Sequence, residues 1–564
     1  MDTNDEIGSK TGVNYWLMVS VYRIDFKNIL NKVDWKLLLF LLLFLNVKLA
    51  VKIPAVIIIY LLRFDFKFGF SFKNSRLPLF YPLVMAIALF NLIIYKSYGN
   101  NNYPMVFLMG TGFWILCLLA VHQVKIAVED NNAEIIHHTI LVFFVLNAIV
   151  SLFNIGYIML DAHNFNPYQY QGQYQKYFLG TGDYIRGLTF DISTTNAVLN
   201  AFGVVYFLDR KKPLMVLICM VVLLLTASNF MNIALLVVLA FLFAFRTNRD
   251  QKSLIVICLM FLVVFLGKVS PQNNGYVHET FKNIIHPPTL PLNATPIVVN
   301  ADGLKEPEAA KRIFAQQYLD SLKHINAWHA ANKKSIGTIP SNLPKTASGR
   351  VIVMDANINT PPYQTPTDTP VEQRKLLAFI DQHKAALPLS SRDTYTVSLP
   401  GKALGFLQTA NFLKSHPSKM MTGTGMGNFS SKLAFKATGL QFAGGFPGKY
   451  LYISKDFLLN HLDVYLNFFS KRRELHSLTN NPFSVYDQLI AEYGLIGLTV
   501  FVIFYLGFFT GQYKKLTYGI PVLMLMLAAF FTDYWFEQLS VLVFFELLLL
   551  LNIKETNYLK TAAA

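Results

Sequence analysis

Long stretches of sequence with almost no charged residue constrain this chain more than any other feature. Each stretch is near the length at which a helix crosses a hydrocarbon core of about 30 Å, or is the centre of such a run. Inside lipid, backbone N–H and C=O groups must pair within their own segment, which favours helices. The clearest stretches are Leu37–Val47, Leu79–Ile94, Ile140–Leu160, Leu214–Ala227 and Leu254–Gly267. We therefore expect an all-α polytopic membrane protein.

The composition excludes an ordinary soluble protein, because 53% of the 564 residues are hydrophobic and only 15% are charged. The formal net charge of +16 would suit a nucleic-acid-binding protein. Its basic residues lie in short connectors and in one large polar loop, however, so we exclude nucleic acid as a partner. Cys117, Cys219 and Cys258 all lie in apolar runs, so no disulfide framework is indicated. The polar N-terminal segment shows no cleavable signal pattern.

The apolar runs predict about twelve transmembrane helices, with a large insertion between the ninth and the tenth. The expected crossings are 36–49, 52–63, 78–96, 104–123, 138–160, 192–208, 213–227, 230–245 and 253–268, then 484–510, 519–533 and 538–552. The resulting parts are a cytoplasmic N-terminal segment at 1–35, helices one to nine at 36–268, a periplasmic loop domain at 269–483, helices ten to twelve at 484–552 and a cytoplasmic tail at 553–564.

Basic residues in the short connectors predict which side of the membrane each connector faces. Alternate connectors are rich in Lys and Arg: Arg63, Lys67, Lys73, Arg76, Arg210, Lys211, Lys212, Arg246, Arg249, Lys252, Lys514 and Lys515. The opposite connectors carry few basic residues. The positive-inside rule therefore places both termini in the cytoplasm and residues 269–483 outside, which is the periplasm for a bacterial inner membrane.

The outer insertion is too long for a plain connector and should have structure of its own. Helical patterns cover Glu306–Lys334, Val371–Leu387 and Ser398–Lys414, so we expect a mostly helical cap. The sequence indicates no role for residues 270–370 and no oligomeric state.

The first candidate site lies just before the sixth expected helix. Arg186 would stand at the outer membrane surface, where a guanidinium can hold a phosphate by two parallel hydrogen bonds. Asn196 follows in a Ser-Thr-Thr-Asn cluster at the helix start. A snorkelling arginine beside an N-terminal helix cap explains the same residues without a ligand.

The second candidate site lies in the large loop. Arg392 is followed by glycines at alternate positions, Gly423, Gly425 and Gly427. Such glycines let the backbone approach a ligand closely, or simply form a tight turn. The strand–loop–helix context and the lysine of a Walker phosphate loop are missing, so a turn is favoured over a phosphate cradle.

The third candidate site lies at the outer mouth of the tenth expected helix. His476 follows a basic run there, and a histidine of ordinary pKa can take a proton from a sugar hydroxyl at neutral pH. Asn481 comes next. Glu492 lies inside the membrane segment, where a carboxylate is costly and indicates function or helix pairing. A single histidine is more often structural than catalytic, so His476 alone does not establish catalysis.

Taken together, these segments resemble the O-antigen ligase and O-antigen polymerase family of bacterial membrane glycosyltransferases. Arg186-Gly187 with a Thr/Asn-rich helix start precedes the large loop, and the loop contains the glycine pattern Gly423–Phe429. The loop closes on Ala491–Leu498, Ala-Glu-Tyr-Gly-Leu-Ile-Gly-Leu, which is the most specific match. The resemblance spans roughly residues 140–550.

The resemblance implies a substrate and a mechanism. A glycan carried on undecaprenyl diphosphate would be transferred at the outer leaflet, with Arg186 and Arg392 as the diphosphate ligands. His476 would deprotonate the acceptor hydroxyl, which attacks the anomeric carbon with inversion. Because the arginines neutralise the charge of the leaving group, no metal and no cofactor is implied.

Departures from the family's pattern leave second choices open. The family's His-Asn pair stands where this chain has Asn481, so His461 is a second choice for the base instead of His476. Arg350 likewise competes with Arg392. The residues with supporting roles are Asn196, Asn481, Glu492, Gly423, Gly425 and Gly427.

The resemblance also leaves the acceptor open. A ligase would use a sugar hydroxyl of the lipid A core, a polymerase would extend another carrier-linked glycan, and a protein O-oligosaccharyltransferase would use Ser or Thr. We favour the ligase. A transporter or flippase also suits twelve helices, but transporters usually show paired halves, and no segment of this chain recurs.

Overall fold

The structure is a computed structural model that describes most of the chain. The described residues are 32–45, 48–70, 77–169, 181–190, 192–270, 308–316, 318–319, 322, 371–383, 400–440, 445–468 and 480–563. These residues are mainly helical and include no strand, although Phe70 and Leu77 make an isolated bridge. The prediction of an all-α protein is therefore confirmed for the described part.

The described helices form a main bundle and a group from the large loop. The bundle helices are α2 (Trp35–Phe44), α3 (Leu49–Leu62), α4 (Phe80–Ile94), α5 (Tyr103–Asp130), α6 (Ala133–Ala162), α7 (Ser193–Asp209), α8 (Pro213–Leu225), α9 (Asn229–Phe245), α10 (Arg249–Val264), α19 (Val485–Val500), α20 (Gly507–Thr510), α21 (Gly519–Ala529), α22 (Trp535–Gln538) and α23 (Ser540–Ala563). Short helical turns between them are η1 (Ser97–Gly99), η2 (Pro167–Gln169), η3 (Thr181–Tyr184), η4 (Gly187–Thr189), η5 (Phe265–Val269), η9 (Phe501–Leu506) and η10 (Tyr513–Lys515). The loop group contains α13 (Val371–His383), α14 (Gly401–Ser415), α15 (Pro417–Thr422), α16 (Lys432–Ala437), η7 (Gly448–Tyr450), α17 (Lys455–Asn460) and α18 (Leu462–Phe468).

Apolar helices of membrane-spanning length identify a membrane protein. In the described part of the chain, four helical stretches are long and apolar enough to cross a bilayer: Tyr103–Asp130, Ala133–Asp161, Arg249–Val269 and Val485–Lys515. Shorter apolar helices accompany them: α2, α3, α4, α8, α9 and α21. Helix α2 has 10 residues, so it extends only about 15 Å at about 1.5 Å per residue. Twelve full crossings are therefore not confirmed.

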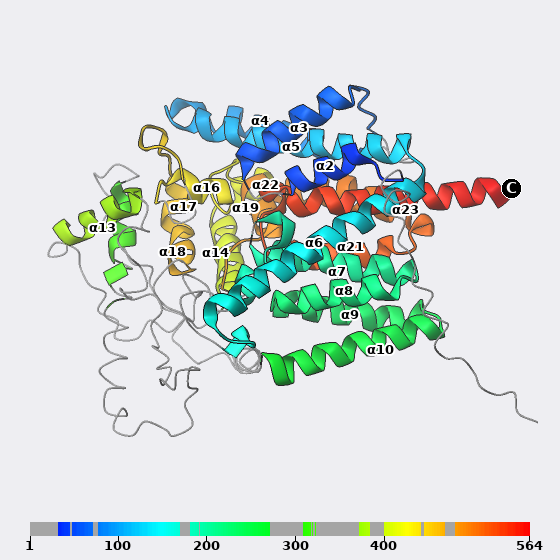
Figure 1. Ribbon diagram of the computed structural model, residues 1–564. Helices are drawn as coiled ribbons and strands as arrows, with labels where there is room; N and C mark the ends of the chain where they lie inside the picture. The colour runs from blue at the N-terminus through cyan, green and yellow to red at the C-terminus, as the bar shows by residue number, and fades with distance from the viewer. Residues whose placement is uncertain are drawn as a thin grey trace, which may run out of the picture.

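The two ends of the bundle differ in character. In Figure 1 the bundle helices run side by side, and the loop helices α13, α14, α16, α17 and α18 lie at the end away from the C-terminus. At the other end, Arg210 pairs with Glu555 of α23. There too, Arg246 Nη1 donates to the carbonyl oxygen of Thr517 at 3.1 Å. We call these the loop end and the basic end. The connectors that contain Arg210 and Arg246 therefore lie at the same end of the bundle.

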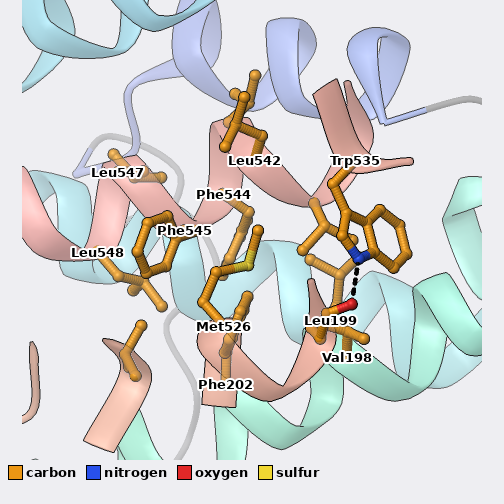
Figure 2. Packing of buried hydrophobic residues seen from close by; sticks show 14 of the residues in the cluster. Val198, Leu199, Phe202, Met526, Trp535, Leu542, Phe544, Phe545, Leu547 and Leu548 are labelled. Atoms are coloured by element: carbon orange, nitrogen blue, oxygen red, sulfur yellow. Dashed lines mark hydrogen bonds between the residues drawn. The ribbon is translucent and has the colours of Figure 1, made fainter. Parts of the chain in front are cut away.

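Helix α23 runs through the centre of the bundle. Its residues Leu547–Leu551 are completely buried, which is typical of a helix that is apolar on all sides. Figure 2 shows Phe544 and Phe545 among side chains of α7 and α21. In the same view, Trp535 Nε1 donates to the carbonyl oxygen of Ala529 at 2.7 Å, which joins α22 to the end of α21.

Polar side chains inside the bundle are bonded to one another. Oε1 of Glu546 accepts a hydrogen bond from Tyr505 Oη at 3.0 Å and another from Tyr81. Lys52 Nζ donates to Ser540 Oγ at 2.7 Å. Because lipid offers no hydrogen-bond partners, these contacts connect α3, α4, η9 and α23 from within.

The loop group has an apolar core of its own. Buried side chains from α13, α17, α18 and the described helical residues near 313 form it, including Ile313, Leu376, Ile380, Phe457 and Leu462. The predicted helices are confirmed where they are described: α13 lies within Val371–Leu387, α14 nearly coincides with Ser398–Lys414, and residues 308–316 are helical.

Candidate functional site

Arg186 lies between η3 and η4, in a turn built on the bundle. Both η3 and η4 pack on α6 and α7. The turn follows the far end of α6, which begins at the basic end, so Arg186 lies at the loop end. Its side chain is exposed, and its Cζ atom lies 5.6 Å from the ring centroid of Tyr184. An exposed guanidinium supported by an aromatic ring keeps its donors available for an anion.

Asn196 is completely buried beneath this turn. Its Nδ2 donates to the carbonyl oxygen of Ile185 at 2.9 Å and to Ser151 Oγ at 3.1 Å. Its Oδ1 accepts from Asn147 Nδ2 at 2.8 Å. Asn196, a predicted supporting residue, therefore fixes the backbone next to Arg186 and does not face a ligand itself.

The glycine pattern forms a tight turn, as the sequence predicts. Gly423, Gly425 and Gly427 have φ values of 80°, 91° and 75°, which side chains larger than glycine rarely adopt. The N–H of Gly427 donates to Glu492 Oε2 at 2.7 Å, and the N–H of Phe429 donates to Oε1 at 3.0 Å. The carboxylate of Glu492 thus takes the backbone donors that a phosphate would need.

The same turn seals a break in α19. At Gly494, φ of 68° and ψ of −167° interrupt the helix. A Cβ atom on Gly494 would overlap the carbonyl oxygen of Met421, so only glycine fits. Before the break, Thr424 donates its N–H to the carbonyl oxygen of Ala491 at 2.9 Å. We call residues 421–429 and 491–494 the α19 joint.

His461 and Asp487 form a buried pair beside the α19 joint. The exposed fractions of the two residues are 0% and 1%. Nε2 of His461 lies 3.7 Å from Oδ2 of Asp487, which is too long for a direct hydrogen bond. The ring centroid of His461 lies 5.1 Å from that of Phe429 and 5.4 Å from that of Tyr465. Burial lowers the pKa of His461 to about 3, so the ring is neutral at pH 7.

A small space adjoins this pair. Neither ring nitrogen of His461 has a hydrogen-bond partner among the described residues. A Cβ atom added to Gly405 would lie 3.4 Å from His461 Cε1 and 3.9 Å from Asp487 Oδ2, both ordinary contact distances. Thr409, one turn along α14 on the same face, points its hydroxyl toward the Asp487 carboxylate.

Polar contacts also tie α14 to the start of α19. Lys402 Nζ donates to the carbonyl oxygen of Phe483 at 2.6 Å, and Gly401 donates its N–H to Asn480 Oδ1 at 3.0 Å. Burial lowers the pKa of Lys402 to about 7. Asn481 Oδ1 accepts from the N–H of Phe483 at 2.6 Å. Asn481, another predicted supporting residue, therefore shapes the turn that starts α19.

The structure brings some of the predicted residues together and places others apart. Those gathered around the first half of α19 are Gly423, Gly425, Gly427, Asn481, Glu492 and His461. Arg186 and Asn196 belong to a different part of the bundle, between α6 and α7. His476, Arg392 and Arg350 lie outside the described residues. Convergence of Arg186 and Arg392 therefore stays a prediction.

Sequence reasoning missed Asp487, Gly405 and Asn147. An acidic residue in the first turn of a helix is usual, so Asp487 carries no local sign of its contact with a distant histidine. Gly405 and Asn147 lie inside regular helices, where nothing in the sequence marks the close approach of another segment. Among the described residues, no group of three or more His, Cys, Asp or Glu is placed to hold a metal ion.

No protein-family model, curated protein or solved structure matches this chain. A function is therefore assigned from the residues, from their geometry and from the resemblance noted in the sequence.

Glu492→Gln should destabilise the protein although the two side chains have the same shape. An amide has one acceptor oxygen, so its NH₂ group would face the N–H of Gly427 or of Phe429 without a bond. A buried group left unsatisfied costs about 1–3 kcal/mol, which thermal unfolding in detergent micelles measures. Asp456→Asn is the control, because Asp456 pairs with Lys419 near the surface and such pairs contribute under about 1 kcal/mol. An equal fall in melting temperature in both variants would contradict this role of Glu492.

His461→Phe should make stability less sensitive to acid. Unfolded histidine has a pKa near 6.5, whereas that of buried His461 is about 3. Between these values the unfolded chain binds the extra proton, so stability is complete above pH 6.5 and falls as the pH drops toward 3. At pH 5 the loss is about 2 kcal/mol, and Phe removes it. Melting temperatures at pH 7.5 and pH 5 measure the effect, with the exposed His416→Phe as control. An unchanged acid response in His461→Phe would refute the assignment.

Proposed function

We propose that this protein is a bacterial inner-membrane glycosyltransferase that moves a glycan from undecaprenyl diphosphate to an acceptor hydroxyl at the periplasmic face. The observation that carries the proposal is the exposed Arg186, whose flanking backbone is bonded by side-chain amides. From Ala133 at the basic end to Asn154, which bonds this turn, α6 rises about 31 Å at about 1.5 Å per residue. A hydrocarbon core is about 30 Å thick. The agreement between these two lengths supports a guanidinium that can reach the diphosphate of a membrane-anchored carrier.

In this proposal the basic end faces the cytoplasm and the loop end faces the periplasm. About twelve helices cross or enter the membrane, and residues 269–483 form a periplasmic domain between the ninth and the tenth. Two observations support this topology. Basic connectors meet at one end with the end of α23, and the loop helices gather at the other (Figure 1). Both termini are then cytoplasmic.

Two arginines stabilise the leaving diphosphate in the proposed reaction. Arg186 and Arg392 bind its oxygens, and a guanidinium can do so through two parallel hydrogen bonds. The acceptor oxygen forms a bond to the anomeric carbon while the glycosidic C–O bond breaks on the opposite face, and the diphosphate leaves with the electron pair. His476 accepts the hydroxyl proton. Fixed cations stabilise the developing negative charge, so the scheme needs neither a metal nor a cofactor.

His476 suits the role of base better than His461 does. A pKa of about 3 makes His461 a weak proton acceptor at neutral pH. The ring is also completely buried among aromatic side chains. His461 instead fits a structural role beside the α19 joint. The glycine turn fits a structural role too, since Glu492 occupies its N–H groups.

The acceptor that we propose is a sugar hydroxyl of the lipid A core, which makes the protein an O-antigen ligase. A polymerase that extends a carrier-linked glycan and a protein O-oligosaccharyltransferase are the alternatives with the same donor chemistry. A transporter or flippase is a weaker alternative, because no segment of the chain recurs as the paired halves of transporters do.

Arg186→Ala should lower glycan transfer by about 10²–10³-fold, the usual effect of removing one group that stabilises transition-state charge. His476→Ala should lower transfer by about 10²–10⁴-fold, as expected for loss of a general base. The measurement is transfer by purified protein in liposomes that contain lipid-linked donor and acceptor.

The controls for this assay separate catalysis from folding. Lys449→Ala removes an exposed cation of the loop group and should leave the rate of glycan transfer unchanged. His461→Phe should retain transfer at pH 7.5. Full activity in His476→Ala together with loss in His461→Phe would move the base to His461. Full activity in Arg186→Ala would refute the diphosphate role.

A deletion strain should show lipopolysaccharide cores without long glycan chains, while those chains persist on the carrier lipid. This outcome follows if the protein joins finished chains to the core. Gel profiles of lipopolysaccharide and of extracted carrier lipid measure it, with the deletion complemented by the wild-type gene as control. Cores that carry a single repeat unit would instead identify a polymerase, and unchanged profiles would oppose both.

A further inference from the structure

Side-chain amides hold the backbone on both sides of Arg186, and those of Asn147 and Asn196 are completely buried. Asn196 Nδ2 donates to the carbonyl oxygen of Ile185 at 2.9 Å. Gly187 donates its N–H to Asn154 Oδ1 at 3.2 Å. Leu188 donates its N–H to Asn147 Oδ1 at 3.0 Å. The peptide groups that flank Arg186 are therefore bonded to side chains of α6 and α7, while the arginine side chain itself stays exposed.

The amides of Asn147, Asn196 and Asn200 also hydrogen-bond to one another. Asn147 Nδ2 and Asn200 Nδ2 both donate to Asn196 Oδ1, each at 2.8 Å. Asn196 Nδ2 donates in turn to Ser151 Oγ at 3.1 Å. The amide orientations of Asn147, Asn196 and Asn200 are thus fixed by one another, and in a low-dielectric interior such connected networks are rigid.

Gly187 shows how closely the turn approaches the network. Its φ is +57°, and a Cβ atom there would overlap Asn147 Oδ1 and lie 2.9 Å from Asn196 Oδ1. Only glycine combines that backbone conformation with that proximity. The turn therefore packs tightly against the amides of Asn147 and Asn196.

We infer that Asn147 and Asn154 are positioning residues, which preorganise the Arg186 guanidinium toward the diphosphate of the lipid carrier. The inference rests on the proposed function. Ile185 and Gly187 on either side of Arg186 are buried, so the amides satisfy backbone groups that water does not reach. The same bonds fix the point from which the exposed guanidinium extends. Holding the turn rigid lowers the ordering cost of binding, which is how preorganisation strengthens affinity.

The test is binding of farnesyl diphosphate, a short carrier-lipid analogue, to the full-length protein in detergent micelles at constant salt. Arg186→Ala should weaken binding by about tenfold or more, since a bidentate charged contact is lost. Asn147→Ala should weaken it to a similar extent without lowering the melting temperature below the assay range. The double variant should bind no more weakly than Arg186→Ala, because Asn147 acts through Arg186.

Two further variants keep the result interpretable. Asn232→Ala removes a buried asparagine of α9 whose amide atoms have no hydrogen-bond partner among the described residues, and it should bind normally. Asn154→Ala, which removes a single bond to the turn, replaces Asn147→Ala if the latter unfolds.

The outcomes separate this inference from the proposed function. Weak binding in Arg186→Ala with normal binding in both asparagine variants would overturn positioning and leave the proposed function standing. Additive losses in the double variant would also overturn it, because Asn147 would then act elsewhere. Normal binding in Arg186→Ala would remove the diphosphate role itself.

Discussion

The carboxylate of Glu492 and the break in α19 that it seals connect the two parts of this protein. A helix interrupted beside lipid leaves backbone N–H and C=O groups that are costly without partners. The glycine turn supplies partners: the N–H groups of Thr424 and Gly425 donate to the carbonyl oxygens of Ala491 and Glu492. The Glu492 carboxylate in turn receives the N–H groups of Gly427 and Phe429. Separating the loop group from the bundle would expose a buried carboxylate, so the two parts are held as one unit at this joint.

The backbone of the Arg186 turn also needs hydrogen-bond partners, and uncharged groups supply them. Here the non-helical backbone is bonded by the amides of Asn147, Asn154 and Asn196, where the α19 joint uses a carboxylate. A carboxylate does lie close to Arg186: burial raises the pKa of Asp183 to about 6, and the nearby Arg186 guanidinium opposes this rise. The amides carry no charge, so they fix the turn without adding a second counter-charge to the guanidinium.

The sequence predicts α5, α6 and α10 because lipid imposes a length and a hydropathy that can be read locally. It predicts α2 and α21 as crossings on the same grounds, yet where a short helix such as α2 lies depends on tertiary contacts. One is the buried bond from Lys52 Nζ to the carbonyl oxygen of Phe44 at 2.6 Å. The same distinction applies to the candidate site, where the sequence predicts local turns but not contacts between distant residues. The glycine pattern predicts a turn, but the partner of that turn, Glu492, lies 65 residues away from Gly427. The pairing of His461 with Asp487 likewise leaves no local pattern.

The burial of His461 beside Asp487 affects how the proposed catalytic base can be tested. Protonation of His461 would place a charge among Phe429 and Tyr465 in a completely buried site. Since Phe429 belongs to the α19 joint, acid destabilises that joint whether or not His461 takes part in catalysis. A fall in transfer rate below pH 6.5 would therefore have two sources, loss of the folded joint and protonation of the base. In His461→Phe the acid sensitivity of the joint is absent. The dependence of its transfer rate on pH therefore measures the pKa of the proposed base.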